Sequence, residues 1–467
     1  MKQVSVRRGT YVDSVALMQV SRRLTELDGV QAALVAMATD LNVGLAQEMG
    51  FDVPAASPND MLVAVDAASQ AALDAAAAEA DAALSGPAPS SAFGGPPPPV
   101  TVRAAAARSG ATIAMVSTPG RYAFADAVDA IDAGLDVMVF SDNVPLTQEV
   151  RLKEYAHAPG VLVMGPDCGT AVVGGVGLGF ANVVRPGPVG IVAASGTGAQ
   201  HLMCLLDGVD VGVSHCLGVG GRDLSAAVGG RSTLRALDRL DADPTTSLIV
   251  VVSKPPDPKV ADAVWARASS LATPVLFGLL GEGLPDLTET AASVTAAVGA
   301  TWSAPEHWSG AVPVGRPGGH LRGLFVGGTL RDEAALVLGA DGAPGHTLVD
   351  LGDDRFTVGR PHPMMDGSDR VERLRASIED RATGVLLIDV VLGLNAEDDP
   401  AGELAGVVRA ATSAGVPVVA TVVGTRDDPQ GLRAQVAELS DAGAWVFLSN
   451  AAATRCAQQL AALGGVS

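Results

Sequence analysis

Lysine is nearly absent from this chain. Its 467 residues include only Lys2, Lys153, Lys254 and Lys259, and none of these follows a glycine. The chain therefore has no G-x-x-x-x-G-K-[ST] phosphate-binding loop, which excludes the P-loop NTPases. Acidic residues outnumber basic residues by 51 to 31, and the net charge of −20 argues against broad electrostatic binding to nucleic acid or to an anionic membrane. An anionic ligand would have to be bound locally, by helix N-termini and a few chosen cations.

Cysteine and long apolar runs are also scarce. The four cysteines lie far apart with no C-x-x-C pair, which predicts reduced thiols rather than a disulfide framework or a zinc site. The apolar run at 384–394 is interrupted by Asp389 and stops well short of the ~20 residues that span a bilayer. The chain also shows no secretory signal peptide. We therefore expect a soluble, cytoplasmic protein with no metal site and no membrane partner.

The length predicts three or four domains, since a domain commonly holds roughly 100–200 residues. From residue 100 onward, Val- and Ile-rich strands alternate with helices, which predicts parallel sheets covered by helices on both faces. The order of elements in residues 1–85 instead predicts a small α+β domain of ferredoxin-like type. A Pro- and Gly-rich linker is expected at 86–99, and a second linker at 301–319.

Four glycine-rich segments stand out, and each lies where a predicted strand ends and a helix is expected to begin. In open parallel sheets, ligands bind at this edge. The segments are Gly165–Thr170, Ser195–Gly198, Gly218–Asp223 and Val326–Arg331.

The Ser195-Gly196-Thr197-Gly198 segment has the properties of an anion site. Glycines allow a ligand to approach the backbone closely, and the N–H groups of a first helical turn point outward with the positive end of the helix dipole. The hydroxyl groups of Ser195 and Thr197 can add hydrogen bonds. The alternative is purely structural: glycines permit tight turns, and serine and threonine cap helices.

The order of these motifs resembles a known family. From 101 to about 299 the chain resembles the α subunit of succinyl-CoA synthetase and the wider ADP-forming acyl-CoA synthetases. Residues 323–467 resemble the C-terminal domain of the synthetase β subunit, and this fusion behind an added N-terminal domain resembles the FdrA family. The motifs that carry the resemblance are Gly165-Pro166-Asp167-Cys168, Ser195-Gly196-Thr197, Gly218-Val219-Gly220-Gly221, Val326-Gly327-Gly328 and Leu348-Val349-Asp350-Leu351-Gly352.

The resemblance implies the fold of the larger part of the chain. It implies a truncated, coenzyme-A-binding-like Rossmann domain at 100–185, a flavodoxin-like domain of succinyl-CoA-synthetase type at 186–300 and a second such domain at 320–467. The expected fold class is α/β with doubly wound parallel sheets, together with the small N-terminal α+β domain.

The departures from this family bear on function. The synthetases phosphorylate a histidine in a Gly-His-Ala-Gly loop, whereas the matching stretch Gly281–Asp286 has no histidine. They also place a glutamate where this chain has Lys254, and a lysine suits a free phosphate or carboxylate. The ATP-grasp domain and the first Gly-rich turn that grips coenzyme A are missing from the match. We therefore expect no phosphohistidine cycle, and neither ATP nor coenzyme A as a ligand.

What remains of the synthetase site is a pair of helix N-termini that cradle phosphate. We expect these at Ser195–Gly198 and at the turn Gly393–Ala396, with Lys254 nearby. Among the histidines, His201, His215 and His362 are candidates for catalysis, and Cys168 can also be explained as a small buried apolar residue. The residues expected to bind phosphate or substrate are Gly165, Asp167, Cys168, Gly196, Gly198, Gly220, Gly221, Gly328, Thr329, Gly393 and Asn395, and those expected to act in catalysis are Ser195, Thr197, Lys254 and His201.

Three functions remain open. Resemblance to the FdrA family implies one subunit of a hetero-oligomeric carbamoyltransferase of the oxamate or oxalurate type, which exchanges a carbamoyl group between a ureido nitrogen and phosphate in allantoin-type nitrogen catabolism. Its substrates would be phosphate or carbamoyl phosphate and a small molecule, with no certain cofactor and no nucleic acid. The alternatives are a subunit of an acyl-CoA synthetase and a non-catalytic, anion-binding regulatory subunit.

Overall fold

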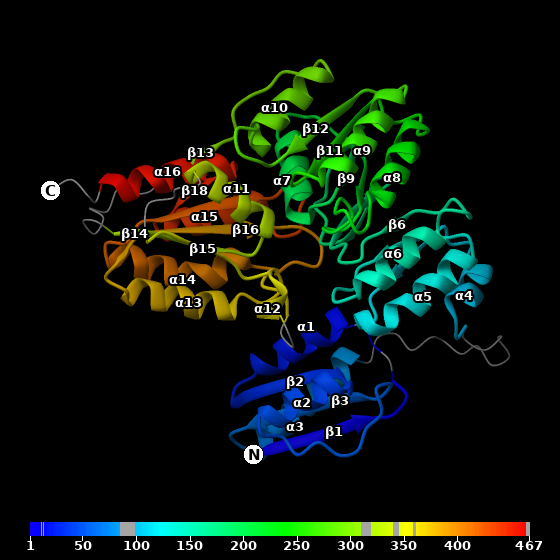
Figure 1. The fold of residues 1–467 in the computed structure, drawn as a ribbon. Helices are drawn as coiled ribbons and strands as arrows, with labels where there is room; N and C mark the ends of the chain where they lie inside the picture. The colour runs from blue at the N-terminus through cyan, green and yellow to red at the C-terminus, as the bar shows by residue number, and fades with distance from the viewer. Residues whose placement is uncertain are drawn as a thin grey trace. The chain divides into compact units, whose positions relative to one another are not determined.

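The computed structural model describes residues 1–10, 12, 14–84, 99–309, 319–339, 345–357 and 361–463 (Figure 1). These form two compact units, Met1–Ala104 with Thr357–Pro361, and Ala105–Phe356 with His362–Ser467. The expected linker at 86–99 lies outside the described residues except for Pro99. Residues 310–318 of the second expected linker also lie outside them, and the part before them contains a short strand, β13 (His307–Trp308), where we expected no regular structure.

The first unit is a small antiparallel sheet with two helices, α1 and α3, packed on one face and α2 on the other. Its three described strands have the order β1-β3-β2, and β3 is antiparallel to both neighbours. This is the split β-α-β arrangement of a ferredoxin-like domain, with three strands in the described residues where a complete domain has four. The elements are β1 (Lys2–Arg7), α1 (Ser14–Thr25), β2 (Val30–Met37), α2 (Asp40–Glu48), β3 (Met61–Ala67) and α3 (Gln70–Leu84).

The second unit begins with a three-stranded parallel sheet in the order β4-β5-β6. A helix precedes the first strand and one helix separates each pair of successive strands along the chain, as expected for a truncated Rossmann domain. The elements are α4 (Val102–Ser109), β4 (Ile113–Val116), α5 (Gly120–Asp132), β5 (Asp136–Val139), α6 (Leu146–Tyr155) and β6 (Val163–Met164).

A six-stranded sheet follows, in the order β12-β11-β9-β10-β7-β8. The strands β12, β11, β9 and β10 are parallel and have the flavodoxin-like order. Helices α7 and α10 pack on one face and α8 and α9 on the other. The elements are β7 (Thr170–Val173), β8 (Val176–Gly179), β9 (Pro186–Ala193), α7 (Gly196–Asp207), β10 (Val213–Gly218), α8 (Arg231–Asp241), β11 (Leu248–Ser253), α9 (Pro258–Ser270), β12 (Val275–Leu279) and α10 (Leu287–Ala297).

One edge of this sheet adds an antiparallel hairpin to the expected parallel strands. Strands β7 and β8 form an antiparallel hairpin, and β7 also pairs antiparallel with β10. The turn consists of Gly174 and Gly175, both with positive φ (58° and 82°). Two consecutive residues with positive φ make the turn whose twist matches a tight hairpin, and glycine adopts them without strain.

The last sheet has the order β13-β18-β17-β16-β14-β15, and the strands from β14 to β18 have the full flavodoxin-like order. Helices α13, α14 and α15 pack on one face, and α11 and α16 lie on the other (Figure 1). The elements are β14 (His320–Phe325), α11 (Gly328–Leu338), β15 (Thr347–Asp350), α12 (Asp354–Thr357), α13 (Ser368–Glu379), β16 (Thr383–Val391), α14 (Pro400–Ser413), β17 (Val418–Val423), α15 (Leu432–Asp441), β18 (Trp445–Phe447) and α16 (Asn450–Leu463).

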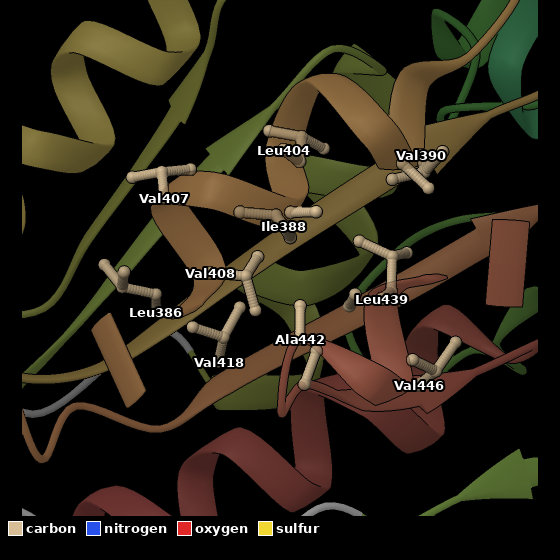
Figure 2. Packing of buried hydrophobic residues seen from close by; sticks show 14 of the residues in the cluster. Leu386, Ile388, Val390, Leu404, Val407, Val408, Val418, Leu439, Ala442 and Val446 are labelled. Atoms are coloured by element: carbon tan, nitrogen blue, oxygen red, sulfur yellow. The ribbon is translucent and has the colours of Figure 1, made fainter. Parts of the chain in front are cut away.

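The hydrophobic core of this last domain is built around β16. Every residue of β16 is buried, and Leu386, Ile388 and Val390 point toward Leu404 and Val408 of α14 (Figure 2). Burying one such side chain contributes about 1.5–3 kcal/mol. The expected α/β fold class, with parallel sheets and a small N-terminal domain containing an antiparallel sheet, is confirmed.

Candidate anion-binding site

The four glycine-rich segments pack against one another in two pairs, all within the second unit. In the first pair, a Cβ atom on Gly218 would lie 2.5 Å from both Cys168 Sγ and the Thr170 carbonyl oxygen. A Cβ atom on Gly220 would lie 2.6 Å from the carbonyl oxygen of Pro166. Glycine is therefore required at 218 and 220 by close packing against the Gly165–Thr170 segment.

The second pair brings two helix N-termini together. Ser195 caps α7, its Oγ accepting a hydrogen bond from Gly198 N at 3.0 Å, and it also hydrogen-bonds Thr329 Oγ1 in the first turn of α11. A Cβ atom on Gly327 would lie 3.0 Å from the side chain of Thr197. Helix geometry leaves the first N–H groups of each helix without an intrahelical acceptor. The positive ends of two helix dipoles thus meet at one place.

This place lies at the topological switch point of the six-stranded sheet that contains β9 and β11. Ser195 follows β9 and Lys254 follows β11, and the two strands are parallel neighbours in which Ala193 pairs with Val252. The flavodoxin-like order places a ligand site between these two strands. Lys254 Nζ lies 2.5 Å from Asp332 Oδ2 on α11, the helix whose first turn contacts Ser195.

The N-terminus of α11 is held by a residue that we did not identify from the sequence. Asp389 of β16 is completely buried, and its carboxylate accepts hydrogen bonds from Val326 N at 2.8 Å and Gly327 N at 2.9 Å. The buried Arg370 donates to the Asp389 carbonyl oxygen at 2.6 Å. Burial raises the pKa of Asp389 to about 6, while Arg370 and the two N–H groups lower it. In the sequence Asp389 only interrupts an apolar run, so no local pattern indicates this role.

The expectation of a second helix N-terminus at Gly393–Ala396 is wrong. Gly393 and Asn395 have φ of 124° and 60°, which lie outside the helical region. The next helix, α14, begins only at Pro400, with Asp399 as its cap. Asn395 Nδ2 instead donates to the Gly179 carbonyl oxygen at 2.8 Å, so this turn joins the two flavodoxin-like domains. The partner of α7 is α11.

Cys168 and the three candidate histidines are buried or hydrogen-bonded within the fold. Burial raises the pKa of Cys168 to about 12, so its thiol stays protonated. His201 is completely buried, burial lowers its pKa to about 4, and its Nε2 accepts from Asn450 N at 3.4 Å. His215 Nδ1 accepts from Gly174 N at 3.1 Å in the hairpin turn. Burial also lowers the pKa of His362 to about 4, and its ring lies 5.8 Å from that of Phe180.

The other expected site residues divide between the two pairs of segments. Gly165 has a φ of 88°, and Asp167 has a φ of 56° and donates its N–H to the Ser141 carbonyl oxygen at 3.0 Å. A Cβ atom on Gly196 would lie 3.4 Å from Thr170 Oγ1, and one on Gly221 would lie 3.9 Å from the Ala194 carbonyl oxygen. The two pairs are therefore in contact with each other. The expected residues at the paired N-termini are Ser195, Gly196, Thr197, Gly198, Gly328 and Thr329.

A buried polar cluster joins the helices behind the site. Glu333 of α11 is 1% exposed, and its two oxygens accept from Leu287 N at 2.7 Å and from Asn450 Nδ2 at 2.8 Å. Asn450 is the first residue of α16 and also holds His201 of α7. Burial, with a contribution from the charge of Asp286, raises the pKa of Glu333 to about 7, although both hydrogen bonds lower it.

This raised pKa predicts a pH-dependent stability. The folded protein holds the Glu333 proton more tightly than the unfolded chain, whose glutamate pKa is near 4.5. The resulting stabilisation is complete below about pH 4.5 and is lost as the pH rises through 7. We expect Glu333 to lower the free energy of unfolding of the wild type by on the order of 2–3 kcal/mol between pH 5 and pH 8. Glu333→Gln should lack this decrease. Urea unfolding at both pH values measures it, with the exposed Glu379→Gln as control. Equal pH dependence in Glu333→Gln and wild type would contradict this assignment.

Two family models match parts of the sequence. Residues 1–96 match the AllF heavy metal-associated domain, and residues 324–460 match the CoA-ligase domain. Residues 1–96 contain neither cysteine nor histidine. Because soft heavy metals select thiolate and imidazole ligands, these residues do not fit a heavy-metal site, and we derive no chemistry from a metal there.

Relatives match the chain over different lengths. The protein YahF of Escherichia coli is 34% identical over 94% of this chain and 95% of its own length. The α subunit of malate–CoA ligase from Methylorubrum extorquens is 26% identical over 40% of this chain and 64% of its own length. The α subunit of ADP-forming succinate–CoA ligase from Aquifex aeolicus is 26% identical over 33% of this chain and 51% of its own length.

One solved structure aligns with most of the chain at low sequence identity. The dinucleotide-forming acetyl-coenzyme A synthetase 1 of Ca. Korarchaeum cryptofilum aligns with 78% of this chain and 86% of that chain, at 18% identity and a TM-score of 0.32. Within the described ranges, none of the helices has the length and apolarity needed to cross a bilayer.

Proposed function

The chain belongs to the family of the Escherichia coli protein YahF, and we propose that it is a carbamoyltransferase subunit in which the paired N-termini of α7 and α11 bind phosphate. One observation carries the proposal: the capping residue of α7, Ser195, hydrogen-bonds Thr329 in the first turn of α11, beside Lys254. The N–H groups of both helices and the ammonium group together suit a phosphoryl group.

Carbamoyl transfer uses the phosphate that this site is proposed to bind. An oxygen of hydrogen phosphate bonds to the carbamoyl carbon, the bond from that carbon to the ureido nitrogen breaks, and the proton of the hydrogen phosphate passes to that nitrogen. The reverse steps use carbamoyl phosphate. The helix N-termini and Lys254 would hold the phosphate and stabilise its charge. No covalent enzyme intermediate is required, which agrees with the protonated Cys168 and with the absence of histidine from Gly281–Asp286.

The remaining parts of this proposal concern partners and substrates. We assign the subunit to an FdrA-type enzyme of allantoin-type nitrogen catabolism, with oxamate or oxalurate as the small-molecule substrate. Other subunits of a hetero-oligomer would complete the active site, and coenzyme A would not take part. His201 has no catalytic role in this proposal because it is completely buried against α16.

A second candidate function is a subunit of an acyl-CoA ligase. The matches to the CoA-ligase domain and to the α subunits of malate– and succinate–CoA ligases favour it. Calorimetry of the full chain with coenzyme A distinguishes the two candidates. Binding at micromolar concentration supports the ligase, and absence of binding at millimolar concentration supports carbamoyl transfer.

Phosphate binding tests the proposed site directly. We expect inorganic phosphate to raise the melting temperature of the wild type, and Lys254→Ala to weaken phosphate binding at least tenfold, because a hydrogen bond to a charged group contributes about 1.5–3 kcal/mol. Thr197→Val should weaken binding less, since it removes one hydroxyl and keeps the volume. Lys259→Ala, another exposed lysine, is the matched control. Equal protection of the wild type and Lys254→Ala by phosphate would refute the role of Lys254.

A further inference from the structure

The carboxylate of Asp332 forms ion pairs with two cations at the proposed anion site, Lys254 and Arg331. Asp332 Oδ2 lies 2.5 Å from Lys254 Nζ, and Asp332 Oδ1 lies 2.7 Å from Arg331 Nη1. The side chain of Asp332 is 17% exposed, whereas that of Lys254 is 63% exposed. An anion that uses Lys254 and Arg331 must therefore compete with the charge of Asp332.

The surrounding charges strengthen this competition. A Cβ atom on Gly328, the first residue of α11, would lie 2.5 Å from Asp350 Oδ2. Burial raises the pKa of Asp350, and the charges of Asp353 and Asp332 raise it further, while Arg331 lowers it. The N-terminus of α11 is thus surrounded by carboxyl groups, and a weakly charged anion gains little by entering.

We propose that Asp332 determines the charge specificity of this site, so that it accepts phosphoryl dianions and rejects monoanions. This inference rests on the proposed phosphate site. A ligand displaces Asp332 from Lys254 and Arg331 only if its attraction to them exceeds that of one carboxylate, and Coulomb attraction grows with the charge of the ligand. A phosphoryl dianion carries more charge than a carboxylate, whereas acetate carries the same charge and bears the additional cost of being immobilised.

As a consequence, the site would distinguish the phosphoryl group of one substrate from the carboxylate group of the other. Inorganic phosphate and carbamoyl phosphate carry a dianionic phosphoryl group near neutral pH, whereas the carboxylate of a ureido acid is a monoanion. Asp332 would exclude that carboxylate from the phosphate position and so fix the orientation of the small substrate. Specificity obtained by a repulsive group is a common device in binding sites.

Calorimetry with inorganic phosphate and with acetate at pH 8 tests this inference in the full chain. We expect the wild type to bind phosphate and no acetate, and Asp332→Asn to bind phosphate at least tenfold more tightly and to bind acetate as well. Asp353→Asn is the matched control, because it removes a nearby charge that influences the same Asp350 carboxyl group. Its affinities should stay within threefold of the wild type.

The outcomes separate the inference from the proposed function. If no variant binds phosphate, the phosphate site itself is wrong, and the inference fails with it. If the wild type binds phosphate and Asp332→Asn shows the same affinities, or Asp353→Asn changes as much as Asp332→Asn, only the role of Asp332 is wrong. The wild type alone gives a second measurement: its phosphate affinity should rise at least fivefold from pH 6 to pH 8 as the dianion forms. A flat pH dependence would overturn the inference even if Asp332→Asn does not fold.

Discussion

Replacing Lys153 by methionine is expected to destabilise the second unit by about 3–5 kcal/mol, because it removes one partner from a buried ion cluster. Lys153 is 1% exposed, and its Nζ lies 2.9 Å from Glu149 Oε1 and 2.9 Å from Asp223 Oδ1. It also donates to the Val219 carbonyl oxygen at 3.0 Å. The cluster thereby fixes the Gly218–Asp223 segment to α6. Methionine would leave the buried carboxylate of Asp223 without a cation and that of Glu149 with Arg222 alone, whose Nε lies 2.9 Å from Glu149 Oε2.

Thermal unfolding of the full chain measures this loss, which corresponds to a fall in melting temperature of about 10 °C. The exposed Lys259→Met is the matched control and should change the melting temperature by less than about 2 °C, since surface substitutions usually stay within ±0.5 kcal/mol. Adding Asp223→Asn to Lys153→Met removes the carboxylate that loses its cation and should recover part of the loss. A Lys153→Met variant as stable as the control would show that the cluster contributes nothing.

Gly218→Ala is expected to destabilise the protein by about 3 kcal/mol, near the upper end for overpacking. The new Cβ atom would lie 2.5 Å from the Thr170 carbonyl oxygen, which belongs to the backbone and cannot rotate away. It would also lie 2.5 Å from Cys168 Sγ. The Gly165–Thr170 and Gly218–Asp223 segments would have to separate, and the neighbouring α7 N-terminus would be disturbed with them.

The same substitution elsewhere should have the opposite sign. Gly406 lies on the exposed side of α14, and no described atom is within 4 Å of the position of its Cβ atom. Gly406→Ala should therefore stabilise the protein by about 0.5–1 kcal/mol, since alanine favours the helix. Urea unfolding of both variants compares them directly. Equal effects of the two substitutions would mean that the packing at Gly218 is not tight.

The strands of the flavodoxin-like domains could be predicted because their sequences are short, Val- and Ile-rich apolar runs. Thr383–Val391 forms β16 with every residue buried, as expected for the centre of a parallel sheet that is covered on both faces. The hairpin of β7 and β8 was also within reach, because Gly174-Gly175 between two valines is the sequence of a tight turn. We missed it because both strands have only four residues.

Only one of the two helix N-termini at the candidate site could be predicted from the sequence. Ser195–Gly198 caps a helix as expected, because a serine followed by glycines after a buried strand is a local signal. Its partner depends on which segments of another domain come near it. The Gly393–Asn395 turn and the Gly327–Thr329 turn both follow strands, and only backbone conformation separates them. Asp389 holds Gly327, which is 62 positions away, and Lys153 holds Asp223, which is 70 positions away, so no local pattern reveals these two contacts.

Because α7 and α11 follow strands of different sheets and contact each other, the proposed site forms only where the two domains meet. Ser195 and Thr329 lie 134 positions apart and belong to different flavodoxin-like domains. A ligand held by both N-termini therefore binds only to the docked arrangement of the domains. Its apparent affinity is the intrinsic affinity multiplied by the fraction of molecules in which they are docked. A change at the interface that alters the fraction of docked molecules therefore alters how much ligand is bound, even when the change lies far from the ligand.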